Sequence, residues 1–155
     1  MDLGLVWSDM LKLTKKADYG LIALRHLAMA RPSRSASAKE IADAYGIPLP
    51  LLAKVLQTLA REGLLTAVMG TNGGYKLARD PRTISALEVI RILDGPIILT
   101  SCFTHEGCGQ SGKCGVKEPL RRIHQGILGL LESITISAMS EEAPETLAMS
   151  VLEKV

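Results

Sequence analysis

The chain has 155 residues, the size of one domain, and its 47% hydrophobic but only 3% aromatic composition predicts an aliphatic core, which favours helices over a β-sandwich. Its net charge of +2 is unevenly divided: residues 11–82 carry 12 Lys and Arg against 5 Asp and Glu, as in nucleic-acid binders, whereas residues 83–155 carry 6 against 9. No run approaches the ~20 apolar residues of a membrane span. The opening lacks the basic region of a signal peptide, and three cysteines do not indicate a disulfide framework, so we expect a cytoplasmic protein without membrane contact.

The first predicted helix follows a short N-terminal extension, residues 1–9, which ends before Met10. Apolar residues recur at helical spacing across residues 14–31. Thr14 is a suitable N-cap, and Pro32 ends the helix. The apolar face of this helix consists of Ala17, Leu21, Leu24 and Ala28.

Two further helices are predicted close together, at residues 38–45 and 49–62, with a turn at Gly46 between them. Two short helices joined by a tight glycine turn are typical of a helix-turn-helix. The inward face of the second helix is Leu52, Val55, Leu56 and Leu59. Its outer face is Pro50, Ala53, Lys54, Gln57, Thr58 and Arg61.

A β-hairpin is predicted next, with strands at residues 64–68 and 75–78 and a glycine-rich turn at 70–74. A hairpin directly after a helix-turn-helix is a wing. The order of helices and hairpin therefore predicts a winged-helix DNA-binding domain over residues 10–82. We expect Lys54, Gln57 and Thr58 to reach base edges or phosphates, and Lys12, Lys15 and Lys16 to anchor phosphates.

The C-terminal half begins with a linking helix and a strand-like connector over residues 83–101, followed by a loop at 102–115. A long helix is predicted from about Glu118 to Ile134, within a dimerisation segment 116–139, and an acidic tail occupies 140–155. The long helix carries an a/d seam that either packs on its own domain or joins two subunits, and we favour a dimer. The seam residues are Leu120, Ile123, Ile127, Leu130 and Ile134. The predicted fold is mainly α with a small β-hairpin wing.

The loop carries the chemistry, because Cys102, Cys108 and Cys114 stand at C-x5-C-x5-C among glycines and polar residues. Zinc and iron–sulfur clusters both favour sulfur ligands, and the wide spacing mildly favours a cluster. Buried structural thiols and a metal-free disulfide switch are the alternatives. A fourth ligand must come from another residue type, and the candidates are His105, Glu106, Asp18 and His124, with the Lys117 ammonium disfavoured.

The chain resembles the Rrf2 family of winged-helix repressors over roughly residues 10–139. The segments that carry the resemblance are LKLTKKADYGLIALRHLA, AKEIADAYGIPLPLLAKVLQTLAREGLL, GTNGGYKLARDP, ISALEVIRILDGP and the three-cysteine loop. Within the family, DYGLIAL, LLAKVLQTLAREGLL and GPIILTSC are most similar to regulators of SUF-type iron–sulfur assembly operons.

The resemblance implies a homodimer, a palindromic operator in double-stranded DNA, and an iron–sulfur cluster, [2Fe–2S] rather than [4Fe–4S], on the three cysteines. Some relatives use a histidine three residues after the last cysteine, but Lys117 occupies that position here. Others use an acidic residue of the partner's first helix, which matches Asp18, so Asp18 ranks before Glu106 and His105. Where family wings often place arginine, this chain has Met69, and Asn72 or Lys76 would substitute.

These features predict a repressor that senses iron–sulfur cluster status and controls cluster-assembly genes. A nitric oxide or redox sensor of the same family and a zinc- or thiol-based repressor are the alternatives. An enzyme or electron carrier is disfavoured, because the sequence has no nucleotide loop or acid–base pair and lacks a fourth cysteine.

Overall fold

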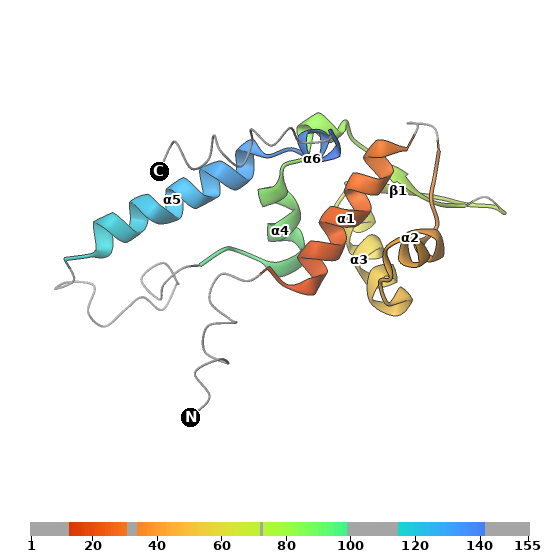
Figure 1. The fold of residues 1–155 in the computed structure, drawn as a ribbon, viewed down its shortest axis with the longest axis horizontal. Coiled ribbons are helices and arrows are strands. Elements are labelled where there is room, and N and C mark those ends of the chain that lie inside the picture. Colours follow the sequence, from red (N-terminus) through yellow and green to blue (C-terminus); the bar gives the residue numbers. More distant parts are fainter. Residues whose placement is uncertain (1–12, 31–33, 72, 99–114, 142–155) are drawn as a thin grey trace, which may run out of the picture.

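The computed structural model describes residues 13–30, 34–71, 73–98 and 115–141 (Figure 1). Helices and a single hairpin make up this part of the chain, which confirms the predicted fold class and element order. The elements are α1 (Lys15–Met29), α2 (Ala38–Tyr45), α3 (Leu49–Arg61), β1 (Leu65–Val68), β2 (Gly74–Leu77), the 3₁₀ turn η1 (Pro81–Thr83), α4 (Ala86–Asp94), α5 (Lys117–Ser133) and α6 (Ile136–Ser140).

Local sequence accounts for where the helices begin and end. The Thr14 hydroxyl accepts a hydrogen bond from the backbone N–H of Ala17, and Ser37 and Ser85 cap α2 and α4 in the same way. Gly46 ends α2 in the left-handed conformation, at a φ of 65°, which glycine adopts without steric cost. The predicted N-cap at Thr14 and the glycine stop at Gly46 are thus confirmed.

The core lies where α1, α3 and α4 pack together, with α2 covering α3. Its largest fully buried side chains are Leu24, Ile41, Leu52, Leu56, Leu59, Leu64, Ile84, Val89, Ile90 and Ile136. The inward face predicted for the third helix is confirmed, because Leu52, Val55, Leu56 and Leu59 are all buried. This core fixes the direction in which the outer face of α3 points.

The wing is fastened to the rest of the domain by a short third segment. β1 and β2 pair antiparallel, with Leu65 opposite Leu77 and Val68 opposite Gly74, one residue from the predicted strand bounds. Ala36, in the connection before α2, exchanges two backbone hydrogen bonds with Tyr75, at 2.9 and 2.8 Å. The hairpin therefore has a fixed base beside the helix-turn-helix.

Gly74 sits at this base, and replacing it with alanine should weaken the docking of the wing. A Cβ there would overlap the backbone carbonyl of Ala36, which cannot move aside as a flexible side chain can. We expect Gly74→Ala to lower the free energy of unfolding by about 1–3 kcal/mol, as overpacking does. Chemical denaturation would measure this. Gly129→Ala on α5 is the matched control, since its Cβ would meet nothing within 4 Å and should be neutral or stabilising; equal stability of the two variants would contradict the prediction.

The long C-terminal helix predicted from about Glu118 to Ile134 is confirmed as α5, within one residue at each end, and a further short helix, α6, follows it. Helix α5 ends at Ser133, the backbone at Ile134 is extended, and α6 packs against α1. The Ala86 N–H donates to the carbonyl of Ile134 at 2.8 Å, and the Ile136 N–H donates to the carbonyl of Ile84 at 2.9 Å. Ile136 is fully buried, so the segment after α5 is part of the core. One end of α5 is therefore held on the domain, while Figure 1 shows its other end leading away from the packed helices.

Candidate nucleic-acid interface

The outer face of α3 presents polar side chains to solvent. Pro50, Lys54 and Gln57 are exposed, as predicted from their spacing. Pro50 lies in the first turn, where its missing N–H breaks no helical hydrogen bond. Thr58 is half-buried, and its hydroxyl donates to the backbone carbonyl of Lys54 at 2.9 Å. Its oxygen can therefore only accept from a ligand, which makes Thr58 a poorer contact than Lys54 or Gln57.

Two of the three lysines predicted to anchor phosphates lie in the first turn of α1, where Lys15 and Lys16 are exposed; Lys12 is outside the described residues. The N-cap of α1 is tied to the end of α4, because the backbone N–H and hydroxyl of Thr14 both donate to the Asp94 carboxylate. This contact spans 80 residues of sequence and places the start of α1 beside α3 and α4.

A basic hollow of about 310 Å³ lies where these three helices meet. Arg61, at the end of α3, lines it together with residues already predicted as DNA contacts. Sequence reasoning placed Arg61 on the outer face of α3 but gave it no role, because nothing local shows that it lies beside α1. The lining residues are Lys16, Leu51, Lys54, Val55, Gln57, Thr58, Arg61 and Leu93.

The described part of the wing leaves two side chains in solvent. Lys76 projects from β2 and is exposed. Met69, at the position where the family resemblance led us to expect arginine, is 92% exposed beside the turn. Asn72 is outside the described residues. The Lys76 side chain is therefore accessible to a ligand such as DNA. The Met69 side chain is also accessible, but it is uncharged and cannot pair with a phosphate.

The predicted metal ligands are mostly beyond what the structure describes. Cys102, Cys108, Cys114, His105 and Glu106 all lie in the segment 99–114, outside the described residues. Asp18 is in the first turn of α1 and is exposed. Within the described ranges no group of three or more His, Cys, Asp or Glu residues could hold a metal ion.

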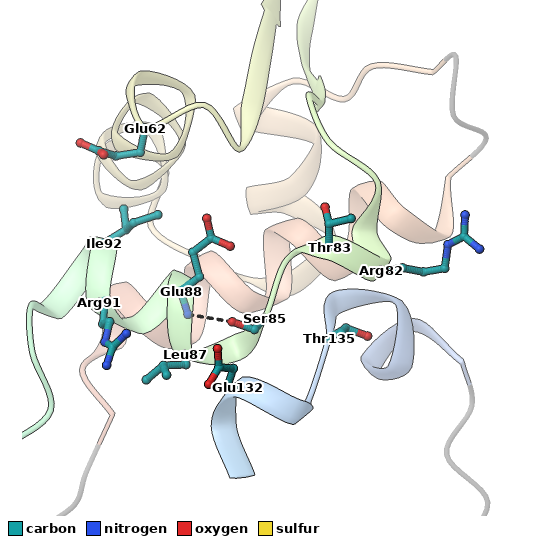
Figure 2. Close-up of a pocket in the computed structure, with 10 residues that line it drawn as sticks. All are labelled: Glu62, Arg82, Thr83, Ser85, Leu87, Glu88, Arg91, Ile92, Glu132 and Thr135. Carbon is teal, nitrogen blue, oxygen red and sulfur yellow. Dashed lines mark hydrogen bonds between the residues drawn. The ribbon is translucent and has the colours of Figure 1, made fainter. Parts of the chain in front are cut away.

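A second, open hollow of about 750 Å³ lies between α4, η1 and the end of α5 (Figure 2). Its side chains do not converge on one point, since Glu62 and Arg82 lie at opposite ends of the view. Glu88 forms a salt bridge with Arg79 at 2.5 Å. The side-chain hydrogen bond from Arg82 lowers the pKa of Asp80. This arrangement of separated and paired charges does not build a ligand site.

The long helix α5 has an apolar face that its own domain leaves uncovered. Ile123 is 55% exposed and Leu130 41% exposed, whereas Leu120 and Ile127 are half-buried. Ile134 is partly buried against the core of its own chain, where the extended backbone turns the chain back onto the domain. Val116, 56% exposed and seven residues before Ile123, extends the uncovered face and was missed.

Comparison with known proteins identifies the chain. A family model named Rrf2 and described as an iron-dependent transcriptional regulator matches residues 13–142. The protein belongs to the Rrf2 family. It is accordingly a DNA-binding transcription regulator and not an enzyme, as predicted.

Solved structures of other Rrf2 regulators share this fold. CymR (YrzC), the global cysteine regulator of B. subtilis, is 28% identical, with a TM-score of 0.73, covering 87% of this chain and 100% of CymR. IscR of T. potens is 32% identical, with a TM-score of 0.67, covering 88% and 90%. The oxidized form of Staphylococcus aureus CymR is 25% identical, with a TM-score of 0.69, covering 86% and 99%.

In this Rrf2 regulator, none of the described helices is both long and apolar enough to cross a membrane. Figure 1 shows the helix-turn-helix and the wing on one side of the described domain, with α5 leading away from them. The predicted DNA contacts and the cysteines thus lie in different parts of the sequence.

Proposed function

We propose that this Rrf2 regulator is a cytoplasmic repressor that senses iron–sulfur cluster status and controls iron–sulfur assembly genes. The observation that carries the proposal is the place of the three cysteines in the chain order, directly between α4 and α5. Helices α4 and α5 pack against each other, and α4 also packs against α1 and α3. A change in that segment therefore acts on helices that contact the DNA-binding elements.

The donor set suits a cluster. Cys102, Cys108 and Cys114 would supply three thiolates, and Asp18 of the partner subunit a carboxylate, with Glu106 and His105 as the alternatives. The exposed position of Asp18 on α1 supports this choice, since a second subunit can reach it. Family resemblance favours [2Fe–2S] over [4Fe–4S]. When bound, the cluster cross-links the loop, and oxidants or iron shortage remove that cross-link.

The DNA-binding form is proposed to be a homodimer on a palindromic operator. Ile123 and Leu130, exposed on α5, would form the subunit contact together with Val116, the exposed residue just before this helix. Lys54, Gln57 and Pro50 would face the major groove, and Lys15 and Lys16 the backbone, together with Lys12. Lys76 and Asn72 would approach the DNA from the wing.

Regulation then follows from the anchored end of α5. Because Ile136 holds that end on the core, ordering the other end sets the angle of α5 and hence the spacing of the two DNA-binding domains. Cluster binding can shift operator affinity only by as much as it favours the DNA-competent arrangement. A tenfold change requires about 1.4 kcal/mol.

The test is anaerobic purification of the full-length protein, with a visible spectrum and iron and sulfide counts, followed by operator binding before and after chelation. We expect a coloured protein whose operator affinity falls at least tenfold when the cluster is removed. Equal operator affinity of the two forms would refute cluster-dependent repression.

A thiol-responsive repressor is the second candidate, favoured by the similarity to the cysteine regulator CymR and to its oxidized form. In that case the same purification yields a colourless protein without iron, and operator affinity changes with thiol oxidants instead. A zinc-containing repressor would also be colourless but would contain zinc. A nitric oxide sensor would be coloured and would lose DNA affinity on exposure to nitric oxide.

A further inference from the structure

The basic hollow between α1, α3 and α4 is lined by cations from two helices. Lys54 and Arg61 lie seven residues apart on α3, so they share one helix face with Gln57 between them. Lys16 joins them from the first turn of α1. None of the described residues that line the hollow is acidic. The charged side chains that line the hollow are therefore all basic.

These cations are available to a ligand. The salt bridges formed among the described residues involve neither Lys16, Lys54 nor Arg61. The Thr14–Asp94 contact fixes the start of α1 beside the end of α4, which holds the backbone of Lys16 at the hollow. Leu51, Val55 and Leu93 supply an apolar floor. Like-charged side chains gathered around such a floor would repel one another unless an anion lay between them.

We propose that this hollow binds one phosphate group, held by Arg61 and Lys16 with Lys54 beside them. The guanidinium of Arg61 can donate two parallel hydrogen bonds to phosphate oxygens, and the ammonium of Lys16 can donate to another oxygen of the same phosphate. The Gln57 amide can donate a further, uncharged hydrogen bond. The Thr58 hydroxyl cannot, because it already donates to the backbone carbonyl of Lys54. Arg61 is thus a further binding residue. The phosphate comes from the DNA backbone, if the proposed DNA-binding function holds, or from a free phosphate.

The first experiment measures binding of the full-length protein to a fixed 30-base-pair duplex of arbitrary sequence at several salt concentrations. Phosphate contacts are independent of sequence, and each adds about 0.9 to the slope of log affinity against log salt. We expect Arg61→Gln to reduce the slope by about one for each DNA-binding domain, or about two for a dimer. Arg122→Gln on α5, a residue 80% exposed and distant from the hollow, removes the same charge and should leave the slope unchanged.

A second experiment separates the two sources of phosphate. Inorganic phosphate is titrated into the DNA-free protein while the amide NMR signals of Gln57 and Arg61 are followed. Saturable shifts in the wild type, absent in Arg61→Gln, with an unchanged DNA salt slope, would identify a free phosphate as the ligand. A reduced slope identifies the DNA backbone. If Arg61→Gln alters neither the slope nor the titration, the inference is wrong.

The double variant Lys16→Gln, Arg61→Gln tests whether both side chains hold the same phosphate. Shared contacts are non-additive, so its loss of affinity should be smaller than the product of the two single losses. Losses that multiply fully would contradict a common site. If the wild-type protein binds no duplex but its phosphate titration saturates, the proposed DNA-binding role fails while this site stands.

Discussion

Replacing Cys102, Cys108 or Cys114 with alanine should abolish the visible absorption and the bound iron of the anaerobically purified protein, each to the same extent. The chain has only these three cysteines, so no other cysteine can replace the thiolate ligand that is lost. Operator affinity should fall to that of the cluster-free wild type, at least tenfold, and the three variants should be indistinguishable. Iron and sulfide analysis with operator titration would measure both effects.

The control for the cysteine variants is Ser111→Ala, which changes a hydroxyl in the same segment and should leave iron content and affinity unaltered. Far-ultraviolet circular dichroism should also be unchanged in every variant, because the described core consists of residues outside this segment. A cysteine variant that keeps a full complement of iron would remove that residue from the proposed ligand set. The Asp18→Asn variant then tests the fourth position separately.

Introducing a charge at the uncovered face of α5, with Ile123→Glu, should convert the proposed dimer to monomers. The side chain is 55% exposed in the single chain, so the substitution leaves the folded monomer intact. In a dimer the new carboxylate would be buried without a partner, which costs several kcal/mol. We expect operator affinity to fall about 100-fold or more, because two linked DNA-binding domains bind far more tightly than one.

Light scattering during size exclusion would measure the mass of the particle, and thermal unfolding would report the state of the monomer. Gln125→Glu is the matched control, since it adds the same charge on an exposed position of α5 away from Ile123. It should remain dimeric with wild-type operator affinity. A dimeric Ile123→Glu variant that binds DNA normally would show that subunits meet elsewhere.

Local patterns predict most of the DNA-binding domain. Apolar residues at helical spacing, the N-cap at Thr14 and the left-handed Gly46 each act within a few residues, so the sequence alone is enough to locate α1, α2 and α3. The hairpin is also local, because a glycine-rich turn joins two adjacent strands. The outer face of α3 follows from the same periodicity, and the C-x5-C-x5-C spacing marks the three cysteines as candidate ligands.

Contacts between distant segments could not be predicted in this way. The hydrogen bonds of Ala36 to Tyr75, of Thr14 to Asp94 and of Ile136 to Ile84 join residues 39 to 80 positions apart, and no local signal marks them. The seam of α5 shows the consequence most clearly. From the heptad pattern alone, all the apolar residues of α5 are equally good candidates for a subunit contact. In the structure, α4 packs against α5 and Ile134 packs against the core, so only some of these residues remain uncovered.

Sequence by itself thus determined the family, the helix-turn-helix with its wing and the three candidate ligands, because these depend on residue type and short spacing. Only the tertiary structure decided which residues of α5 remain available to a partner and that Arg61 stands with Lys16 around one hollow. Both depend on how helices far apart in the chain pack, and that packing is set by the whole core.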